Sequence, residues 1–507
     1  MDIVTRHRYH LAVGIFIGLG VFLRVIHLTT RELDPDESWV VYSVMQPTLT
    51  GMLENIVVAP PLFSYLLFLS LKILPSSEFF LRLLPLLFSI GSLPLIYLLS
   101  LKITKSKTIS LISLLLLAVC PWQIFYSRYV KQYSAETFFT ISLLFVGTNV
   151  ILGDRKLKNW TYFTYAFLII VAPLFSFANI FITLAIAGLS LWRFLKTRDL
   201  KRLLINALPF LIAGILFFMA YLYLIKGQSE NKAVLDYWEG KNGFPDLTSF
   251  VSFFKWLFIN LNAILIEYSL GSKWVFPLWG LFVAGNIYLW RKKQRLALYS
   301  ISSVILLLIF ASFINKYPFS GSRLTLFTSP ITFIILASGI RSLSNSFKKV
   351  HLKFLVIFAT LLCFIPTFKD TFIQLRDTRG FGIRESVVFI ENQVDEDDLI
   401  INFNLKDTLW NYYYLDKFGD TNAWDEPTRK NIGNFEKTKD LIENAEDSIC
   451  IVMKTPWKGF RSRYEKKRRK LLNYLERNSI ILAEFKDKQT EVYYVQPIIV
   501  QSEIKDS

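Results

Sequence analysis

The sequence has few of the residues that form common metal and nucleophile sites. Its 507 residues include four His and three Cys. Cys120 and Cys363 lie in apolar runs and Cys450 lies in a polar region, so neither a disulfide framework nor a paired-cysteine metal site is indicated. The chain also lacks a phosphate-binding GxxxxGK[ST] loop and an HExxH zinc helix. Carboxylates and cations must therefore carry any chemistry.

Apolar residues are abundant by contrast. Hydrophobic residues make up 53% of the chain, 45 residues are Phe, and the mean hydropathy is +0.39. This composition predicts an integral membrane protein. The chain has 57 Lys and Arg against 40 Asp and Glu, a net charge of +17. Short basic loops between apolar runs are typical of membrane topology, so we do not expect nucleic acid as a partner.

Eleven apolar stretches approach the length of about 17–25 residues that a spanning helix needs. They cover residues 11–28, 79–101, 108–122, 134–152, 160–176, 177–195, 203–225, 274–290, 296–313, 324–340 and 352–366. A weaker run at 61–74 is shorter, and we expect it to lie in the membrane interface. About eleven spans are therefore predicted.

The basic loops predict how these spans are oriented. With 61–74 in the interface, five basic loops fall on the same side as Arg6 and Arg8, which places the amino terminus in the cytoplasm. We expect the protein to lie in the cell (inner) membrane. Polar segments then collect on the outer face. They are 29–60, 121–136, 227–273, 315–323 and everything after about 367. Within 227–273, the part from Phe250 to Tyr268 suits an interfacial helix, although a short twelfth span is an alternative.

The composition changes after Pro366, which predicts a membrane domain over 1–368 and a soluble extracytoplasmic α/β domain over 369–507. The patterns predict strands and helices in alternation. The strands are expected at Leu399–Asn404, Ser448–Lys454, Ile480–Phe485 and Glu491–Val495, and the helices at Asp407–Phe418 and Phe460–Asn478. The second helix is strongly basic, which fits either a solvated face or a site for anionic lipid or glycan.

The segment from Leu33 to Trp39 is the main candidate for chemistry. It places the carboxylates Asp34, Asp36 and Glu37 directly after the first apolar stretch. Ionisable groups beside a membrane are candidates for a functional site. The alternative is a solvated loop that caps a helix, because Asp and Glu are favoured in a first helical turn.

Further motifs follow in a fixed order along the chain. They are Pro35-Asp36-Glu37-Ser38-Trp39 with Tyr42; Pro60-Pro61-Leu62; Glu78 and Arg82 with Pro85; Pro121-Trp122 through Tyr126-Ser127-Arg128 to Lys131-Gln132-Tyr133; and Lys316-Tyr317-Pro318 through Arg323. In this order and context the sequence resembles the GT-C membrane glycosyltransferases, especially the branch of the lipid A aminoarabinose transferases and the protein O-mannosyltransferases. The resemblance covers roughly residues 10–345.

The sequence departs from that family at two places. Position 59 is Ala, where many relatives have His and the aminoarabinose transferases have Lys, so any phosphate contact made there must come from elsewhere in this chain. The Trp-Trp-Asp signature of the oligosaccharyltransferase branch is absent, since Trp424-Asp425 follows Ala423. Transfer of a preassembled glycan to asparagine is therefore not expected.

The resemblance implies an inverting transfer of one sugar from a polyprenyl-phosphate donor to a lipid, glycan or protein acceptor at the outer face. Asp36 matches the family's catalytic Asp, and we expect it to act as general base, with Glu37 orienting it or the acceptor. The leaving polyprenyl phosphate needs cations to stabilise it. The candidates are Arg128, Lys131, Lys316 and Arg323.

Other residues of the pocket are also predicted. They are Asp34, Tyr42, Glu78, Arg82, Tyr133, Glu136 and Tyr317. A divalent cation bound by Asp34 and Asp36 would suit carboxylate ligands, although nothing else in the sequence demands a metal.

Several of these residues have simpler roles open to them. Arg128 and Lys131 suit interface anchors, and Glu78 with Arg82 suits an ion pair one helical turn apart. Glu136 suits a first-turn helix residue. Arg24, near the end of the first apolar stretch, suits a snorkelling side chain or one that faces the pocket.

Two other classes of function remain alternatives. A transporter or flippase of lipid-linked sugars would also need ionisable groups and a lipid groove, but it would more naturally have repeated halves and broken helices. A non-catalytic membrane scaffold would not depend on the acidic pair.

Overall fold

The computed structural model describes residues 3–498, apart from the segments 57–58, 153–157, 227–231, 268–274, 295, 348, 350, 352–364, 377–382, 396–397, 404–428, 433, 446, 455–462 and 487–489. The chain divides into two compact units. Unit 1 comprises Met1–Leu28 and Ser43–Asp377, and unit 2 comprises Thr29–Tyr42 and Thr378–Ser507. The acidic segment thus groups with the carboxyl-terminal part of the chain, although nearly all of unit 1 separates them in sequence.

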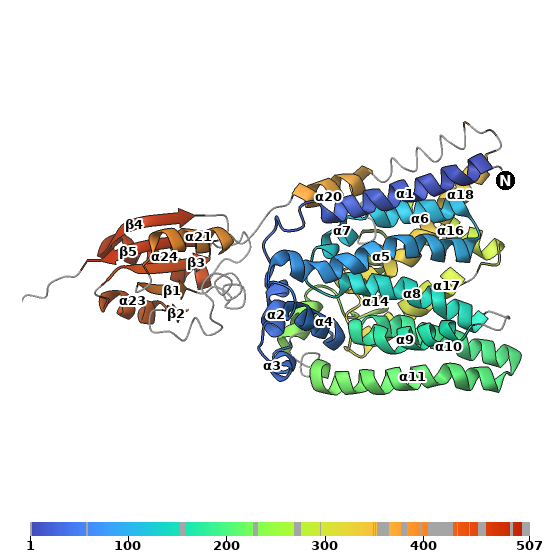
Figure 1. Ribbon diagram of the computed structural model, residues 1–507, viewed down its shortest axis with the longest axis horizontal. Coiled ribbons are helices and arrows are strands. Elements are labelled where there is room, and N and C mark those ends of the chain that lie inside the picture. The colour runs from blue at the N-terminus through green and yellow to red at the C-terminus, as the bar shows by residue number, and fades with distance from the viewer. Residues whose placement is uncertain are drawn as a thin grey trace, which may run out of the picture. The chain divides into compact units, whose positions relative to one another are not determined.

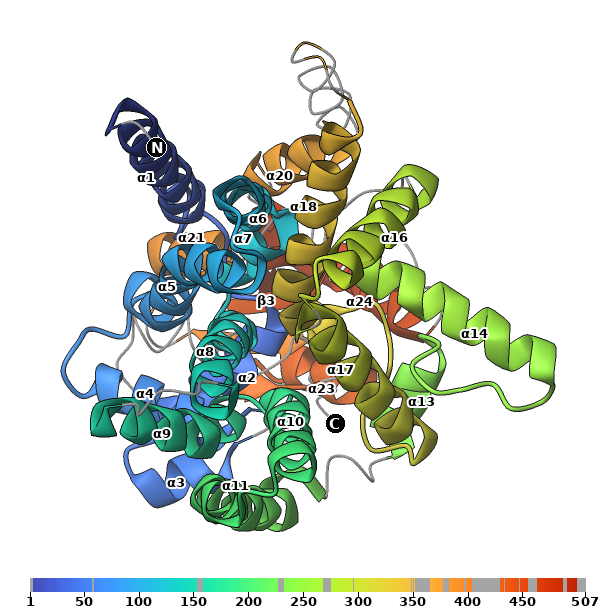
Figure 2. The same ribbon diagram turned by 90° about the vertical axis from the view of Figure 1, so that its right-hand side faces the viewer.

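Unit 1 is a bundle of long helices that run side by side in Figure 1 and are seen end-on in Figure 2. The longer helices are α1 (Ile3–Val25), α5 (Glu78–Thr104), α6 (Lys107–Val119), α8 (Tyr133–Leu152), α9 (Asn159–Phe175), α10 (Asn179–Thr197), α11 (Leu200–Ala220), α16 (Val275–Arg291), α17 (Leu296–Phe313) and α18 (Ser329–Asn345). Shorter elements are α3 (Leu49–Glu54), α4 (Pro61–Leu71), α7 (Pro121–Ser127), η1 (Tyr221–Ile225), α13 (Lys232–Glu239), α14 (Phe250–Asn262), η2 (Ala263–Glu267), η3 (Arg323–Thr328) and α20 (Ile365–Arg376).

Ten of the eleven predicted apolar stretches form these helices, and the eleventh, 352–366, lies almost entirely outside the described residues. Within the described part, five helices are long and apolar enough to cross a membrane, or six if α6 and the bent α7 form one span. Shorter apolar helices accompany them, among them α4 and α14. The chain is therefore a helical membrane protein, while the count of about eleven spans stays a prediction.

Glycine allows two helices of the bundle to pack closely. An added Cβ at Gly285 of α16 would lie 1.9 Å from the carbonyl oxygen of Ile335, and one at Gly339 of α18 would lie 2.0 Å from that of Leu281. Only glycine fits at such separations. Small residues at helix contacts are typical of membrane bundles, where backbones approach each other directly.

A buried arginine holds the break between α6 and α7, where the axis bends by 56°. Pro121 has no N–H and ends the hydrogen-bond ladder of α6, so carbonyl groups near the break lose their helical partners. Arg24 donates to the carbonyl oxygens of Leu117 and Ala118 at 2.9 and 3.0 Å, and Thr371 donates to that of Val119 at 2.8 Å. Of the two roles left open for Arg24, snorkelling does not fit, because its side chain is fully buried.

Unit 2 contains a five-stranded mixed sheet in the order β2-β1-β3-β5-β4. Its strands are β1 (Leu399–Phe403), β2 (Arg429–Asn431), β3 (Ile449–Lys454), β4 (Ser479–Lys486) and β5 (Thr490–Pro497). Its helices are α2 (Pro35–Val44), α21 (Ile383–Gln393), α23 (Phe435–Glu443) and α24 (Arg463–Asn478). β1 runs parallel to β2 and β3, whereas β5 runs antiparallel to β3 and β4.

The four predicted strands and the basic helix α24 are present, and the helix predicted at Asp407–Phe418 lies outside the described residues. The short β2 and the helices α21 and α23 were not predicted. The core of the sheet is apolar, with Ile401, Ile451 and Val495 fully buried on neighbouring strands and Leu471 of α24 packed on them.

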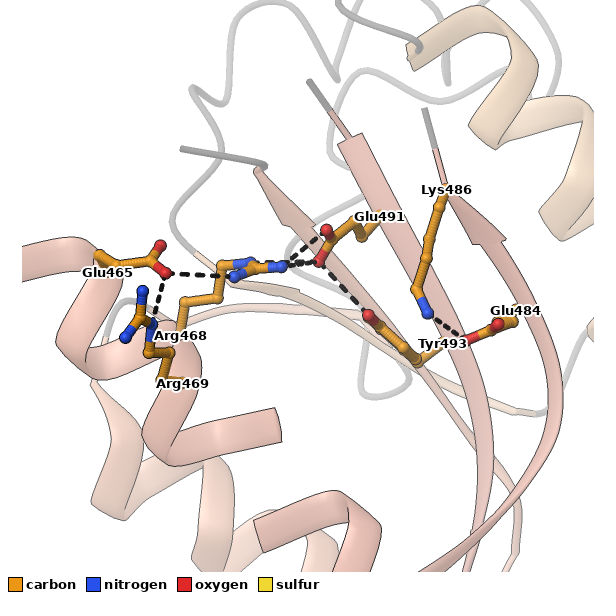
Figure 3. A network of polar contacts seen from close by, with 7 residues as sticks. All are labelled: Glu465, Arg468, Arg469, Glu484, Lys486, Glu491 and Tyr493. Carbon is orange, nitrogen blue, oxygen red and sulfur yellow. Dashed lines mark hydrogen bonds and ion pairs between the residues drawn. The ribbon is translucent and has the colours of Figure 1, made fainter. Parts of the chain in front are cut away.

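Carboxylates of the same unit pair with the basic residues of α24. Figure 3 shows Arg468 reaching from α24 to Glu491 of β5, with hydrogen bonds of 2.7 Å to each carboxylate oxygen. Burial lowers the pKa of Arg468, but the hydrogen bond and the charge of Glu491 outweigh this and leave it raised. Arg469 pairs with Glu465 and Lys470 with Glu436, each at 2.7 Å. This part of the helix is therefore locally neutralised.

We expect Arg468→Met to destabilise unit 2, because it leaves the Glu491 carboxylate, only 8% exposed, without its charged partner. The free energy of opening of the β5 amides should fall by about 2 kcal/mol. Hydrogen exchange on the full chain measures this. The matched control is Arg469→Met, which removes the partner of Glu465. Because the Arg469 side chain is 72% exposed, the free energy of opening should change by less than about 0.5 kcal/mol. Equal losses would contradict a special role for the Arg468 pair.

Candidate functional site

The acidic segment in unit 2 begins α2 with a reciprocal cap. The Asp34 carboxylate accepts the N–H of Asp36 at 2.8 Å, and the Glu37 carboxylate accepts the N–H of Asp34 at 2.9 Å. This is the hydrogen-bond pattern of a capping box, with Pro35 at the first helical position. Asp34 and Glu37 thus take the capping role that was one of the two readings of the segment. Asp36, in the same turn, is partly exposed.

Glu37 has a second partner that fixes its position. Its side chain is fully buried and accepts a hydrogen bond of 2.8 Å from the Arg31 guanidinium. A buried carboxylate that bonds to both a backbone N–H and an arginine cannot turn toward a substrate without losing both. Glu37 therefore suits the positioning of α2 and of its neighbour Asp36. Tyr42, one of the predicted pocket residues, lies further along α2 and is half-buried.

A contact distant in sequence anchors the same loop. The Glu32 carboxylate accepts the backbone N–H of Arg384 at 2.6 Å, in the first turn of α21. Carboxylates are favoured at a helix N-terminus, where N–H groups lack helical partners. The loop that carries Asp36 is thus held by the carboxyl-terminal segment at one end and by its own capping box at the other.

The donor set of this loop does not fit the divalent cation that Asp34 and Asp36 suggested. Among the described residues, no group of three or more His, Cys, Asp and Glu is arranged to hold a metal ion. One oxygen of Asp34 is moreover used by the cap of α2. The proposed reaction therefore includes no metal-dependent step.

In unit 1, two of the other predicted outer segments, 121–136 and 315–323, come together around aromatic side chains. Tyr126 and Tyr133 lie with ring centroids 4.8 Å apart, and both pack with Leu326 of η3. Tyr317 is half-buried and donates to the carbonyl oxygen of Leu324 at 2.8 Å. Burial, and then the neighbouring Glu136 and Tyr133, raise the pKa of Tyr317 well above its usual value, so its phenol stays protonated.

Glu136 of α8 is buried near this cluster. One carboxylate oxygen accepts a hydrogen bond of 2.8 Å from the hydroxyl of Ser176, and the other is buried with no hydrogen-bond partner among the described residues. A buried polar atom without a partner is costly, and in native proteins it often marks a functional site. Glu136 is thus more than a solvated first-turn residue.

Two predicted pocket arginines bind the carboxyl end of α1. Arg82 donates to the carbonyl oxygen of Leu28 at 2.9 Å, and Arg128 donates to that of Ile26 at 3.1 Å. Cations are favoured at the C-terminus of a helix, whose last carbonyl groups have no helical partner. Arg82 is also 3.4 Å from Glu78, so the predicted ion pair is confirmed. These contacts give both arginines a structural role.

The remaining predicted cations differ in their surroundings. Lys131 is 5% exposed, in the turn between α7 and α8. Lys316 is exposed, with its ammonium group 5.8 Å from the centre of the Tyr221 ring. Arg323 is half-buried at the start of η3 and lines a pocket.

That pocket has a volume of about 350 Å³ and lies entirely within unit 1. Its walls combine aromatic rings, amides, hydroxyls and two cations. They are formed by Tyr126, Tyr237, Trp238, Lys241, Asn242, Ile259, Asn260, Ala263, Ser320, Gly321, Ser322 and Arg323. Aromatic rings stack on apolar ring faces, and Lys and Arg bind phosphate, so the lining suits a sugar phosphate.

Most of this lining was missed in the sequence. Of its members, the motifs identified only Tyr126 and Arg323. The turn at Asn242 is held by α14, because Trp256 and Asn260 donate to its carbonyl oxygen at 2.9 and 3.0 Å. Asn242 itself has a left-handed backbone, with a φ of 55°. The aromatic pair Tyr237-Trp238 next to Lys241 was the signal that could have indicated this wall.

Comparison with known proteins relates this architecture to solved structures. No family model matches the chain, and no curated protein sequence matches it. ArnT from Cupriavidus metallidurans in the apo state aligns with a TM-score of 0.59 and 13% identity, over 97% of this chain and 98% of that one. The same protein bound to undecaprenyl phosphate aligns with a TM-score of 0.55, over 95% and 97%. The oligosaccharyltransferase AglB from Archaeoglobus fulgidus aligns at 0.45 over 89% of this chain and 70% of that one, with 12% identity.

The chain has the GT-C fold. The resemblance seen in the sequence motifs is thereby confirmed at the level of the fold, and the alignment with ArnT extends it over nearly the full length. An identity of 13% leaves activity and substrate to be argued from this chain's own residues.

A glycine substitution tests whether the pocket depends on close contact of its walls. In Gly321→Ala the new Cβ would lie 2.0 Å from the Cβ and 2.8 Å from the carbonyl carbon of Ala263, so the two walls must separate. We expect the protein to lose about 1–3 kcal/mol of stability. Gly280→Ala, which meets nothing within 4 Å, should keep or slightly raise the melting temperature. Equal melting temperatures for the two variants would contradict the close packing.

Proposed function

We propose that this protein is an inverting glycosyltransferase. It moves a sugar from a polyprenyl-phosphate donor to an acceptor hydroxyl on the extracytoplasmic face of the cell membrane. The observation that carries the proposal is the GT-C fold, shared at a TM-score of 0.55 with an ArnT structure bound to undecaprenyl phosphate, together with an acidic loop built around a partly exposed Asp36.

The orientation is part of the proposal. The basic loops favour a cytoplasmic amino terminus, which places the segment 29–60 and the carboxyl-terminal unit outside. The donor's prenyl tail stays in the bilayer, and its phosphate and sugar reach the outer loops of unit 1. The acceptor is a lipid, a glycan or a protein hydroxyl.

The proposed reaction is a single displacement. The acceptor oxygen attacks the anomeric carbon and gives its proton to Asp36, while the bond from that carbon to the phosphate oxygen breaks and its electron pair passes to the phosphate. Glu37, held by Arg31 and the cap of α2, positions Asp36. As a separate part of the proposal, which concerns unit 1 alone, Arg323 and Lys241 of the 350 Å³ pocket bind the donor phosphate and stabilise the charge that develops on it.

The general base is tested by Asp36→Asn, which removes the proton acceptor and keeps the shape of the side chain. Release of free polyprenyl phosphate from a panel of polyprenyl-phosphate sugars, with an envelope extract as acceptor, should fall about a hundredfold or more. The melting temperature should stay that of the wild type. Glu54→Gln, which changes an exposed carboxylate in the same outer segment, is the control and should keep full activity.

Transfer retained by Asp36→Asn would refute the assignment of Asp36 as general base. Movement of the donor between leaflets without release of polyprenyl phosphate would favour a transporter.

The cation at the phosphate is tested by comparing two residues of one loop. Arg323→Gln should lower kcat about tenfold to a hundredfold, because a donor that stabilises the leaving group acts mainly in the transition state. Lys316→Gln should change kcat less than about twofold, since Lys316 is exposed beside Tyr221 and does not line the pocket. A larger loss of kcat in Lys316→Gln than in Arg323→Gln would instead assign the phosphate to Lys316, outside the pocket.

A further inference from the structure

A second and larger pocket lies in unit 1 among residues that the proposed reaction does not use. Its volume is about 930 Å³, and it lies where α5, α8, α10 and α16 end and α17 begins. These are the helix ends at the basic loops, which the charge pattern favours as cytoplasmic. The lining consists of Lys102, Ile103, Lys105, Thr148, Asn149, Leu189, Trp192, Lys196, Trp290, Lys293, Gln294, Leu298, Tyr299 and Ser302.

The lining carries charge of one sign. Four lysines surround the cavity, and its described lining contains no Asp or Glu. Lys105, Lys196 and Lys293 are exposed at the rim, and Lys102 is half-buried. Positive charges that line one cavity repel one another, and an anion between them relieves that repulsion. The charge pattern therefore specifies an anionic occupant.

Lys102 is held in a fixed direction. Its ammonium group donates to the carbonyl oxygen of Phe145 and the hydroxyl of Thr148, each at 2.5 Å. An ammonium group has three donors, so two are used by α8 and one remains for a ligand. The centre of the Phe145 ring lies 5.0 Å from the Lys102 ammonium nitrogen.

The walls are also braced. Gln294 donates to the carbonyl oxygen of Thr104 at 2.8 Å, which joins the loop after α16 to the end of α5. Tyr299 of α17 donates to the carbonyl oxygen of Ala185 in α10 at 2.9 Å. The pocket is therefore largely preformed, as ligand sites usually are.

The surroundings of the pocket are those of a membrane interface. Trp192 and Trp290 are 50% and 58% exposed, and Trp is enriched where a helix meets the headgroups. On two of the helices that line the pocket, Leu191 and Leu195 of α10 and Leu306 of α17 are more than half exposed. Large apolar side chains exposed on spanning helices are available to acyl chains.

We propose that this pocket binds the phosphate group of an anionic membrane phospholipid. The lysine ammonium groups surround the phosphate, the two indole rings lie at headgroup level, and the acyl chains follow α10 and α17. Basic pockets between spanning helices are known to take such headgroups. The site is distinct from the 350 Å³ pocket, with which it shares no lining residue.

The test titrates the purified full chain in detergent with phosphatidylglycerol and with phosphatidylcholine, and counts bound lipid by native mass spectrometry. The triple variant Lys105→Gln, Lys196→Gln, Lys293→Gln changes only exposed side chains, so it should fold normally. Its dissociation constant for phosphatidylglycerol should rise at least about tenfold, because each basic residue near a headgroup contributes to binding. Binding of phosphatidylcholine should not change.

A matched control removes three positive charges near the same helix ends without touching the pocket. It is the triple variant Lys158→Gln, Arg198→Gln, Lys201→Gln, all of whose side chains are exposed. We expect its dissociation constant to change less than about twofold. Equal weakening in both triple variants would overturn the proposal in favour of general surface charge, and no weakening in the pocket variant would overturn it outright.

A soluble probe separates a lipid from a free phosphate compound. Glycerol phosphate has the phosphate group but no acyl chains, and it should displace phosphatidylglycerol only at a concentration about a hundredfold higher, since it lacks the methylene groups whose burial adds to binding. Displacement at equal concentration would assign the pocket to a soluble phosphate ligand. None of these readouts requires sugar transfer, so they stand or fall independently of the proposed reaction.

Discussion

The arrangement of unit 1 depends on how the carbonyl groups at the break between α6 and α7 find hydrogen-bond donors. In the low-dielectric interior of a membrane protein an unsatisfied carbonyl group is costly, so a helix can bend there only if side chains replace the missing N–H groups. Arg24 supplies donors to two of them and also to the hydroxyl of Ser89 at 2.8 Å, which joins α1, α5 and α6. The bend turns α7 away from the axis of α6. It thereby carries Tyr126 to the pocket and Gln123 to Thr137 and Ser329.

The need of carbonyl groups at helix ends for hydrogen-bond donors also explains why the arginines have different roles. Arg82 and Arg128 match family motifs, yet both donate to carbonyl oxygens where α1 ends. A guanidinium group has several donors in a fixed plane, so it can hold a helix end and still contact a ligand. Arg323 differs from them, because it begins the short helix η3 in a loop and lines the 350 Å³ pocket.

The sequence predicted most of the fold because the length of the apolar stretches and the basic loops between them are strong signals in a membrane protein. Ten apolar stretches became helices, and the four expected strands formed. The short β2 has no apolar pattern of its own and forms by pairing with β1, so it could not be foreseen. The pocket was missed for a related reason. Its wall at Asn242 depends on a left-handed residue and on hydrogen bonds from Trp256 and Asn260, which are adjacent only in the folded chain.

The hydrogen bond between Glu32 and the start of α21 has a consequence for biosynthesis. Its two residues are 352 positions apart, so all the described helices of unit 1 are synthesised before the partner of Glu32 exists. The acidic loop is among the first segments to be made and among the last to be completed. A nascent chain or an early truncation product thus contains Asp36 but lacks the anchor that positions it. The acidic loop therefore reaches its final hydrogen bonding only after the segment that contains Arg384 has been made.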